Sequence, residues 1–435
     1  MADVQPLRGF RYASEVVGDI AQVVTPPYDV ISPEAQARYY ERNPHNIIRL
    51  ELGLDQPGDN ELNNRYTRAA RTFAEWRKSG VVRQEEQPAY YVYQQRFRAQ
   101  GRDYTRTSLI ARVRIEPWDA RVVLPHERTM SKPKSDRLNI IRATATNLSP
   151  IMSMYDDPQG RIRRLLSNYV EQAEVQLSDE ADEMHILHPI QDPQQIELIR
   201  DFFSERQLYI ADGHHRYETA LNYRNEILEQ RKQLHPDDAA NFVMMALIDL
   251  DDPGMVVEPT HRVLFNLAPE ILNTLVPDRF ADYFTVQQLP EQMQAKELLQ
   301  KLEQAGHDTP SFIIHTAANN LLLSLNVAGK EQMAKSQHSE AWNGLDVAVA
   351  HTLVLEALLG VTPADITAGT HLRYIHEAQD ALNEVSQGTA QVALLLNATR
   401  VRQICEVSDA DDLMPQKSTY FYPKLITGLV MNPLW

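Results

Sequence analysis

The sequence predicts an α/β protein with mixed sheets (α+β), and three observations lead to this class. Short apolar runs with β-branched centres alternate with amphipathic segments along most of the 435 residues. Two long β-rich runs, 89–98 and 104–115, are joined by a polar turn around Gly101, which is the pattern of an antiparallel hairpin. The chain also contains no internal repeat and no low-complexity linker. A hairpin within an alternating chain excludes a purely parallel sheet.

In the first half of the chain, helix start and stop residues mark the expected elements. Ser32 followed by Pro33 is typical of a helix N-cap and first turn, and Gly80 is placed to end a helix. The expected helices are 32–42, 62–78, 136–144, 161–176 and 194–204. The expected strands, besides the hairpin, are 47–52, 151–155, 184–190 and 208–211.

The second half continues the alternation after a long helix from His214 to about Gln230. A strand is expected over 241–250, followed by a strong turn at 251–254. Beyond Phe265 we expect a helix, strands near residues 284, 313, 323 and 392–396, a helix to residue 305, and the most apolar helix over 342–359. The elements divide into three predicted regions: 1–100, a core over 101–265, and an α/β region over 266–435.

Composition excludes several classes of function. The chain has 43 Lys and Arg against 59 Asp and Glu, a formal charge of −16, which disfavours a dedicated nucleic-acid-binding protein but allows a local basic patch. Cys405 is the single cysteine, so an intrachain disulfide and a cysteine-rich zinc site are excluded. No apolar run approaches a membrane span, and the first ten residues lack the layout of a signal peptide. We therefore expect a cytoplasmic protein without a membrane partner.

The most informative stretch is the predicted strand–turn–helix unit around Gly213. An apolar strand over 208–211 is followed by Asp212, Gly213 makes the turn, and a helix begins at His214. Such a unit points the N–H groups and the positive dipole end of a helix at its ligand, so an anion, and phosphate in particular, is the expected occupant. Asp212 adds a carboxylate that could hold a metal ion or orient a donor. Alternatively, Asp212 is only an N-cap, and His214 and His215 are polar surface.

A second group of chemistry-capable residues follows Pro125. His126 and Glu127 precede basic side chains that are unexpected in an acidic protein, namely Arg128, Lys132, Lys134 and Arg137. Prolines and the following helix would hold these charges in place, which favours a loop that faces phosphate. A glutamate held near cations and phosphate is a candidate general base. The alternative is a solvated charged surface.

Three further clusters complete the candidate residues. Tyr28 and Asp29 follow two prolines and are presented ahead of a helix, or else form a rigid turn with a local Asx bond. The remaining candidates are Glu51 as a substitute base, His261 and Arg262 at a strand, and Lys417, Ser418 and Thr419 as phosphate donors. A metal centre on Asp212, His214, His215 and His261 is disfavoured, because adjacent helical histidines project about 100° apart. The metal is therefore left open.

Ordered sequence blocks connect the chain with a known family. The blocks are PPYDVIS, NIIRLELG, LPHERT with KPKSDRL, NLSPI, ADGHHRYETA, PTHRVL, LRYIH and MPQKSTYFYPKLITGLVMNPL. Over essentially its whole length, the chain resembles the bacterial and archaeal domain-of-unknown-function 1015 family, often labelled ParB-like. The label itself implies little about activity.

The middle of the chain has a second, more distant resemblance. The DGHHR block is similar to the ParB/sulfiredoxin superfamily segment that cradles nucleotide phosphates at a helix start, which makes 101–265 a ParB/sulfiredoxin-like core. One branch comprises the free L-serine kinases, whose upstream H-E block resembles LPHERT. The resemblance implies ATP or ADP with Mg²⁺, Glu127 as base, and Asp212 with His214, His215 and Arg216 as the phosphate and catalytic loop.

Two departures from the small kinases put the substrate in doubt. Between Glu127 and Asp212 lie 84 residues, and the flanking regions have no counterpart in those kinases. The sulfiredoxin branch uses a cysteine in this loop, and its absence excludes that activity.

The leading hypothesis is a nucleotide-dependent phosphotransferase on a small hydroxylated metabolite, with free L-serine as the best single substrate, or the reverse phosphatase. Glu127 would take the proton, and His215, Arg216 and Lys132 would neutralise the phosphoryl group, with Asp212 placing Mg²⁺ or a histidine. The alternative is a ParB-type nucleotide-binding switch without turnover, and DNA binding ranks last. We expect a small molecule and a nucleotide as partners and leave a homodimer open. A single active site requires Glu127, His215 or Arg216, and His261 or Lys417 in one cleft.

Overall fold

The computed structural model describes residues 1–127, 131–169 and 173–435, without the side chains of 131–133. The chain divides into two compact units. The first unit comprises Met1–Pro125, Thr129–Val256 and Pro423–Trp435, and the second comprises His126–Arg128 and Val257–Tyr422. The chain therefore returns to the first unit at its C-terminal end.

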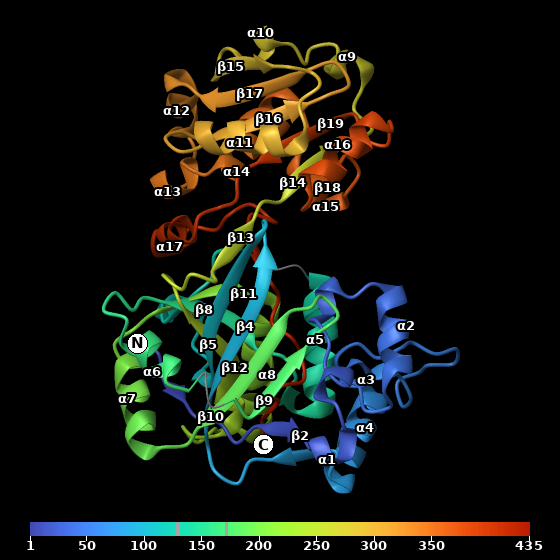
Figure 1. Ribbon diagram of the computed structural model, residues 1–435, viewed down its shortest axis with the longest axis vertical. Coiled ribbons are helices and arrows are strands. Elements are labelled where there is room, and N and C mark those ends of the chain that lie inside the picture. Colours follow the sequence, from blue (N-terminus) through green and yellow to red (C-terminus); the bar gives the residue numbers. More distant parts are fainter. Residues whose placement is uncertain (128–130, 170–172) are drawn as a thin grey trace. The chain divides into compact units, whose positions relative to one another are not determined.

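A mixed sheet is the centre of the first unit (Figure 1). Its strands are β1 (Val4–Gln5), β4 (Tyr90–Ala99), β5 (Arg102–Arg114), β6 (Val123–Leu124), β8 (Ile151–Tyr155), β9 (Val175–Ser178), β10 (Met184–Ile190), β11 (Leu208–Asp212) and β12 (Phe242–Asp249). Among the described residues the sheet has nine strands in the order β6-β11-β8-β12-β5-β4-β10-β9, with β1 beside β5. The pairs β11–β6 and β12–β8 are parallel, and the others are antiparallel. The predicted mixed α/β class and the β4–β5 hairpin are confirmed.

Helices pack on this sheet and around the N-terminal segment. They are α1 (Ser14–Val17), α2 (Pro33–Arg42), α3 (Ile48–Glu51), α4 (Arg65–Ser79), α5 (Ser131–Thr144), α6 (Arg161–Ser167), α7 (Pro193–Phe203) and α8 (His214–Arg231). Buried Tyr155, Phe203 and Tyr217 join β8, α7 and α8 in the main core. A smaller core brings α4 and α5 together with the C-terminal segment. Short strand pairs complete the unit, β2 (Phe10–Tyr12) with β3 (Val82–Gln84) and β7 (Thr146–Asn147) with β21 (Asn432–Pro433).

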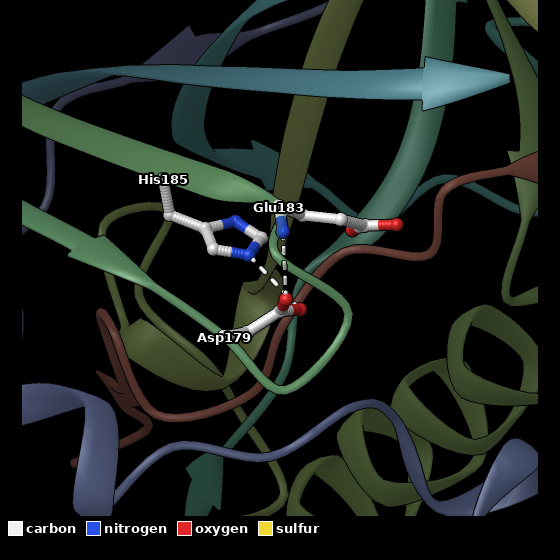
Figure 2. A group of neighbouring side chains, drawn as sticks. All are labelled: Asp179, Glu183 and His185. Carbon is white, nitrogen blue, oxygen red and sulfur yellow. Dashed lines mark hydrogen bonds and ion pairs between the residues drawn. The ribbon is translucent and has the colours of Figure 1, made fainter. Parts of the chain in front are cut away.

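The turn between β9 and β10 lies at an edge of the first sheet. It carries Asp179 and Glu183, which lie beside His185 of β10 (Figure 2). Asp179 Oδ1 accepts hydrogen bonds from the backbone N–H groups of Ala181 (2.9 Å) and Glu183 (3.0 Å). These bonds fix the turn and hold the carboxylate of Asp179 close to the imidazole.

The second unit contains an antiparallel sheet. Its strands are β14 (His261–Leu264), β15 (Phe284–Leu289), β16 (Ser311–His315), β17 (Asn320–Leu325), β18 (Leu372–Ile375) and β19 (Val392–Leu396), in the order β15-β17-β16-β19-β14-β18. Its helices are α9 (Pro269–Leu272), α10 (Pro277–Phe280), α11 (Ala295–Ala305), α12 (Val327–Met333), α13 (Glu340–Asn343), α14 (Asp346–Val349), a π-helix (Ala350–Leu358), α15 (Pro363–Ala368), α16 (Ala378–Ser386) and α17 (Val401–Asp409). β13 (Val256–Glu258) pairs with β20 (Tyr420–Tyr422). Apolar residues of α11 and α16 form the core against this sheet.

Three element predictions are wrong. The expected strand 47–52 is the short helix α3, because Asn46 bonds the backbone N–H of Ile48 (3.0 Å) and starts a helical turn. The expected helix 161–176 ends at Ser167, and Val175 begins β9, where pairing with β10 overrides helical propensity. The expected helix 342–359 is interrupted at Gly344 and continues as α14 and the π-helix.

The division into three regions, 1–100, 101–265 and 266–435, stays a prediction. The unit boundary at Val256 lies near the expected boundary at residue 265, and the expected boundary at residue 100 falls in the β4–β5 turn.

Candidate functional site

The strand–glycine–helix unit has the predicted form. β11 ends at Asp212, Gly213 has φ 100°, and α8 begins at His214. No side chain caps this helix, and Asp212 lies in the strand, so the view that Asp212 is only an N-cap is wrong. His214 is buried, which also excludes the view that both histidines are polar surface. The first N–H groups of α8 have no acceptor within the helix and give this end a positive partial charge.

Asp212 lies between two cations. Its Oδ2 accepts from Arg216 Nη2 (2.7 Å), and its Oδ1 accepts from Lys424 Nζ (2.7 Å). Burial alone would raise the pKa of Asp212, but the charges of Lys424 and Arg216 outweigh burial and hold the pKa well below its usual range. The ionised triad carries one net positive charge, which suits an anionic ligand.

Arg216 is fixed on its other side by backbone and hydroxyl oxygens. Its Nη1 donates to the carbonyl of Pro150 (2.6 Å) and to Ser149 Oγ (3.4 Å). A Cβ on Gly213 would lie 2.8 Å from Arg216 Nε. Glycine at this position therefore permits both the positive φ and the approach of the guanidinium.

Ser149 links this triad to a buried ion pair. Its hydroxyl donates to Glu51 Oε1 (3.3 Å), which also lies 3.1 Å from Arg137 Nη1. Arg137 lies over the ring of Tyr28, 3.9 Å from its centroid. Burial raises the pKa of Tyr28 to about 12, although Arg137 and Arg216 lower it in part. We call this set the Asp212 cluster; its members are Tyr28, Glu51, Asp136, Arg137, Ser149, Asp212, Arg216 and Lys424.

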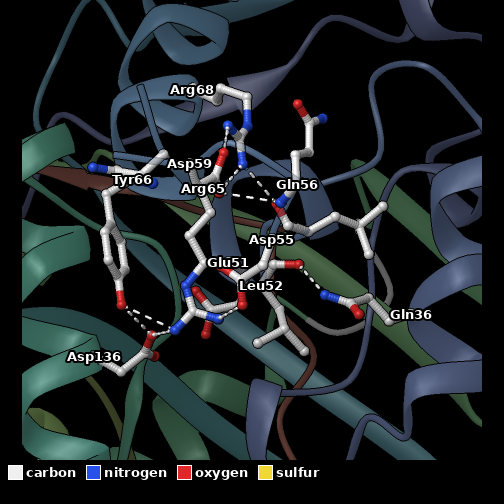
Figure 3. A network of polar contacts seen from close by, with 12 residues as sticks. Gln36, Glu51, Leu52, Asp55, Gln56, Asp59, Arg65, Tyr66, Arg68 and Asp136 are labelled. Atoms are coloured by element: carbon white, nitrogen blue, oxygen red, sulfur yellow. Dashed lines mark hydrogen bonds and ion pairs between the residues drawn. The ribbon is translucent and has the colours of Figure 1, made fainter. Parts of the chain in front are cut away.

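Asp136 extends the cluster toward α4 (Figure 3). It accepts from Arg65 (2.6 Å), the hydroxyl of Tyr66 (2.9 Å) and Arg137. In the same network, Arg68 forms a two-pronged ion pair with Asp59 (2.6 and 2.8 Å), which holds the segment between α3 and α4. The charged side chains of the cluster are thus held from several elements.

A second cluster forms around Glu127 in the second unit. Glu127 Oε1 accepts from the backbone N–H of Lys417 (3.2 Å). His126 Nε2 lies 3.0 Å from Thr419 Oγ1, and the backbone N–H of Met414 donates to the carbonyl of His126 (2.8 Å). Arg262 Nη2 donates to the carbonyl of Lys417 (3.1 Å). These residues, with Tyr374, are the Glu127 cluster.

Burial dominates the electrostatics of the Glu127 cluster. It lowers the pKa of Arg262 to about 10, an effect that Tyr374 and Glu127 partly offset. Burial and the Arg262 charge lower the pKa values of His261 and His351 to about 3 each. Several buried atoms in this part of the described chain lack a hydrogen-bond partner: Thr260 Oγ1, His261 Nε2, Arg262 Nε, His351 Nε2 and Tyr374 Oη. Such atoms are costly without a partner, so polar ligands or water are expected there.

The other predicted residues have local roles. Lys134 pairs with Glu218 (2.9 Å), and the carbonyl of His215 accepts from Thr219 (2.6 Å). Ser418 donates to the carbonyl of Pro415 (2.5 Å), so its hydroxyl is used within its own loop. Asp29 is exposed. Arg128 and the side chain of Lys132 lie outside the described residues.

The structure therefore assembles the predicted residues in two groups. Tyr28, Glu51, Arg137, Asp212 and Arg216 meet in the first unit. Glu127, His126, Arg262, Lys417 and Thr419 meet in the second. A cleft shared by Glu127 and the 213–216 loop joins residues of both units and stays a prediction.

Sequence reasoning missed three members of the Asp212 cluster. They are Lys424, Ser149 and Asp136, although all three lie in or next to sequence blocks that it singled out. Lys424 lies only seven residues after Lys417, for which a phosphate-binding role is predicted.

The donor set of Asp212 does not fit Mg²⁺ as it stands. Both carboxylate oxygens are held by cations, so a magnesium ion would have to displace Lys424 or Arg216. The net positive triad and the start of α8 suit phosphate oxygens instead.

Comparisons with known proteins agree in part with these expectations. A family model described as "Protein of unknown function (DUF1015)" matches residues 4–348. None of the curated proteins has a significantly similar sequence. Within the described residues, no helix combines the length and apolarity that crossing a membrane requires.

Solved structures match at low identity. A conserved hypothetical protein from Pyrococcus furiosus is 12% identical with a TM-score of 0.37, covering 75% of this chain and 97% of its own. A free serine kinase in complex with AMP is 12% identical with a TM-score of 0.37, covering 74% and 91%. SbnI from Staphylococcus aureus, truncated at its C-terminus, is 12% identical with a TM-score of 0.36, covering 75% and 87%.

Proposed function

The chain belongs to the family described as protein of unknown function (DUF1015), and from that premise we propose that it binds a nucleotide at the Asp212 cluster and transfers a phosphoryl group. The acceptor would be a small hydroxylated metabolite, with free L-serine as the first substrate to test. One observation carries the proposal: a positive-φ glycine and a helix N-terminus lie beside a fixed triad with net positive charge. This combination favours phosphate.

The chemistry requires stabilisation of negative charge more than covalent catalysis. A phosphoryl group in transfer spreads charge over its oxygens, and fixed cations stabilise it without reorganisation. Arg216 and Lys424 would supply that charge, and bonds to Asp212 and Pro150 keep Arg216 in place. Glu127 is the proposed acceptor of the hydroxyl proton. The same groups would stabilise the reverse phosphatase reaction.

The proposal is tested by product formation with the full-length protein. ATP or ADP, with and without Mg²⁺, is incubated with L-serine and a panel of other hydroxylated metabolites, and ³¹P NMR detects a new phosphomonoester. We expect a product with the unmodified protein and its loss with Arg216→Met. Arg224→Met is the matched control, because Arg224 lies on the same helix α8 and its Nε donates to Asn241 Oδ1 (3.2 Å), outside the Asp212 cluster. Absence of product in both reaction directions would contradict the proposed phosphotransferase and phosphatase activities.

A nucleotide-binding switch without turnover is the second candidate. It is favoured by the full engagement of both Asp212 oxygens, because a binding site needs no carboxylate available for a metal ion. Calorimetric titration with ATP, ADP and AMP separates the two candidates. Binding that is lost in Arg216→Met, combined with no product from any metabolite, would support the switch.

A further inference from the structure

Three metal-ligating side chains of the first unit converge at the β9–β10 turn. Asp179, Glu183 and His185 each offer one ligand atom, and these atoms lie within 4.8 Å of one another (Figure 2). Among the described residues, this is the group of potential metal ligands whose ligand atoms lie close together. It includes none of the residues of the predicted metal centre on Asp212. The group belongs to neither the Asp212 nor the Glu127 cluster.

The imidazole of His185 provides the second observation. His185 is 1% exposed, and its Nδ1 lies 2.7 Å from the hydroxyl of Tyr93 on β4. Its Nε2 is directed at the turn and lies 3.2 Å from Asp179 Oδ2 (Figure 2). A cation between this nitrogen and the carboxylates would replace the contact between His185 and Asp179 with metal–ligand bonds to both side chains.

We propose that Asp179, Glu183 and His185 bind one divalent transition-metal ion of the zinc class. In a tetrahedral site with bonds of about 2.1 Å, ligand atoms lie roughly 3.4 Å apart. The Asp179–His185 pair, at 3.2 Å, already has nearly this separation. The carboxylate of Glu183 would complete the set by a change of its side-chain torsions.

The donor set selects the class of ion. Imidazole nitrogen suits zinc and its neighbours, whereas Ca²⁺ and Mg²⁺ prefer oxygen alone. Two carboxylates balance the charge of a divalent ion. Glu183 also interacts with the buried guanidinium of Arg106, so the ion would share this carboxylate with Arg106.

Tyr93 would act on the metal through His185. A partner on the second ring nitrogen fixes the orientation and tautomer of a ligating histidine. Tyr93 is buried and stacks on His185 with ring centroids 5.9 Å apart, so it holds the ring from the sheet side. Three protein ligands leave the fourth position to water or another ligand. The ion would connect Asp179 and Glu183, at the two ends of the turn, with His185 on β10.

The test is zinc binding by the full-length protein after chelator treatment. Titration with Zn²⁺ should give one equivalent bound and a higher Tm, since an ion that binds only the folded state stabilises it. His185→Gln and Asp179→Asn should each abolish this equivalent. The matched control is His338→Gln, because His338 forms a similar pair with Asp412 (3.0 Å) and lies outside the site. Co²⁺ should give visible absorption bands in the unmodified protein and lose them in His185→Gln.

A milder variant protects the test against misfolding. Tyr93→Phe removes only the hydroxyl and should keep the stoichiometry while weakening Zn²⁺ binding about tenfold or more. Circular dichroism of each metal-free variant confirms that it is folded. Absence of zinc binding by the unmodified protein, or equal binding by folded His185→Gln and Asp179→Asn, would overturn the proposal.

Discussion

At the scale of single residues, Gly213, which follows Asp212, is constrained both by its backbone conformation and by a neighbouring side chain. Its φ of 100° is rarely adopted by residues with a side chain, and Arg216 fills the space in which a Cβ would lie. Backbone conformation and side-chain contact therefore both require glycine. The two costs can be separated by comparison with another glycine.

Gly213→Ala is expected to lower the free energy of unfolding by roughly 1–3 kcal/mol from backbone strain, with a further loss because Arg216 must move. Gly101→Ala is the matched control, because Gly101 has φ 77° and an added Cβ would meet nothing within 4 Å. Urea denaturation of both variants measures the difference. Equal losses would show that Arg216 adjusts at no cost. Under the proposed function, nucleotide affinity should fall only in Gly213→Ala.

Asp212→Asn tests the charge balance of the triad. It leaves Arg216 and Lys424 without their shared anion, and we expect a loss of roughly 3 kcal/mol of stability at neutral pH. Because the folded pKa is depressed, this stabilisation is present above the unfolded value of about 4 and disappears as pH falls below it. Unfolding free energies of the variant and the unmodified protein should therefore converge in acid. Exposed Asp29→Asn should change stability by no more than about 0.5 kcal/mol at any pH.

Glu127→Gln tests the assignment of the base. The amide keeps the size of the side chain and can still accept from Lys417 N–H, but it cannot take a proton. If Glu127 is the general base, turnover should fall by roughly two to four orders of magnitude. Nucleotide affinity should change little, because the phosphate-binding groups remain. Intact turnover in this variant would move the role to Asp29 or Glu51.

At the scale of elements, β14 and the π-helix bring buried histidines into the second unit. His261 lies on β14, and His351 lies in the π-helix Ala350–Leu358. A π-helical turn is rare and is frequently found at functional sites. Burial and Arg262 keep both histidines neutral, which makes this unit sensitive to acid.

The sign of this acid sensitivity follows from the lowered pKa values. The unfolded chain protonates both histidines below about pH 6.5, whereas the folded chain does so only near pH 3. The free energy of unfolding should therefore decrease as the pH is lowered from about 6.5 to about 3, by about 1.4 kcal/mol per pH unit for each histidine. His351→Gln should remove about half of this contribution. Urea unfolding across the window measures the slope, and exposed His307→Gln should leave it unchanged.

At the scale of the whole molecule, acidic charge is the dominant surface property. The formal charge of −16 opposes binding to a phosphate backbone, even though the triad of Asp212, Arg216 and Lys424 carries one net positive charge. We expect no measurable retention of duplex DNA at physiological salt. Fluorescence anisotropy with a labelled duplex tests this, and binding that weakens steeply with added salt would contradict it.

Local sequence determined the elements that carry the Asp212 cluster. An apolar β-branched run, a glycine and a helical stretch fix β11, Gly213 and α8, because each is a short-range preference. The hairpin and the mixed class follow for the same reason. The wrong prediction of a strand over 47–52 shows the limit of local sequence patterns. Its apolar residues suit a strand, but a side-chain hydrogen bond to Asn46 accompanies the start of a helix there.

Only the tertiary structure decided which charges meet. Lys424 reaches Asp212 across 212 residues of sequence because the chain returns to the first unit at Pro423. Lys417, seven residues earlier, bonds Glu127 in the second unit. Side-chain type and spacing give the possible partners of a charge, whereas the path of the chain selects among them. For that reason the sequence by itself determined the strand–glycine–helix loop, and the fold alone determined the ion pairs beside it.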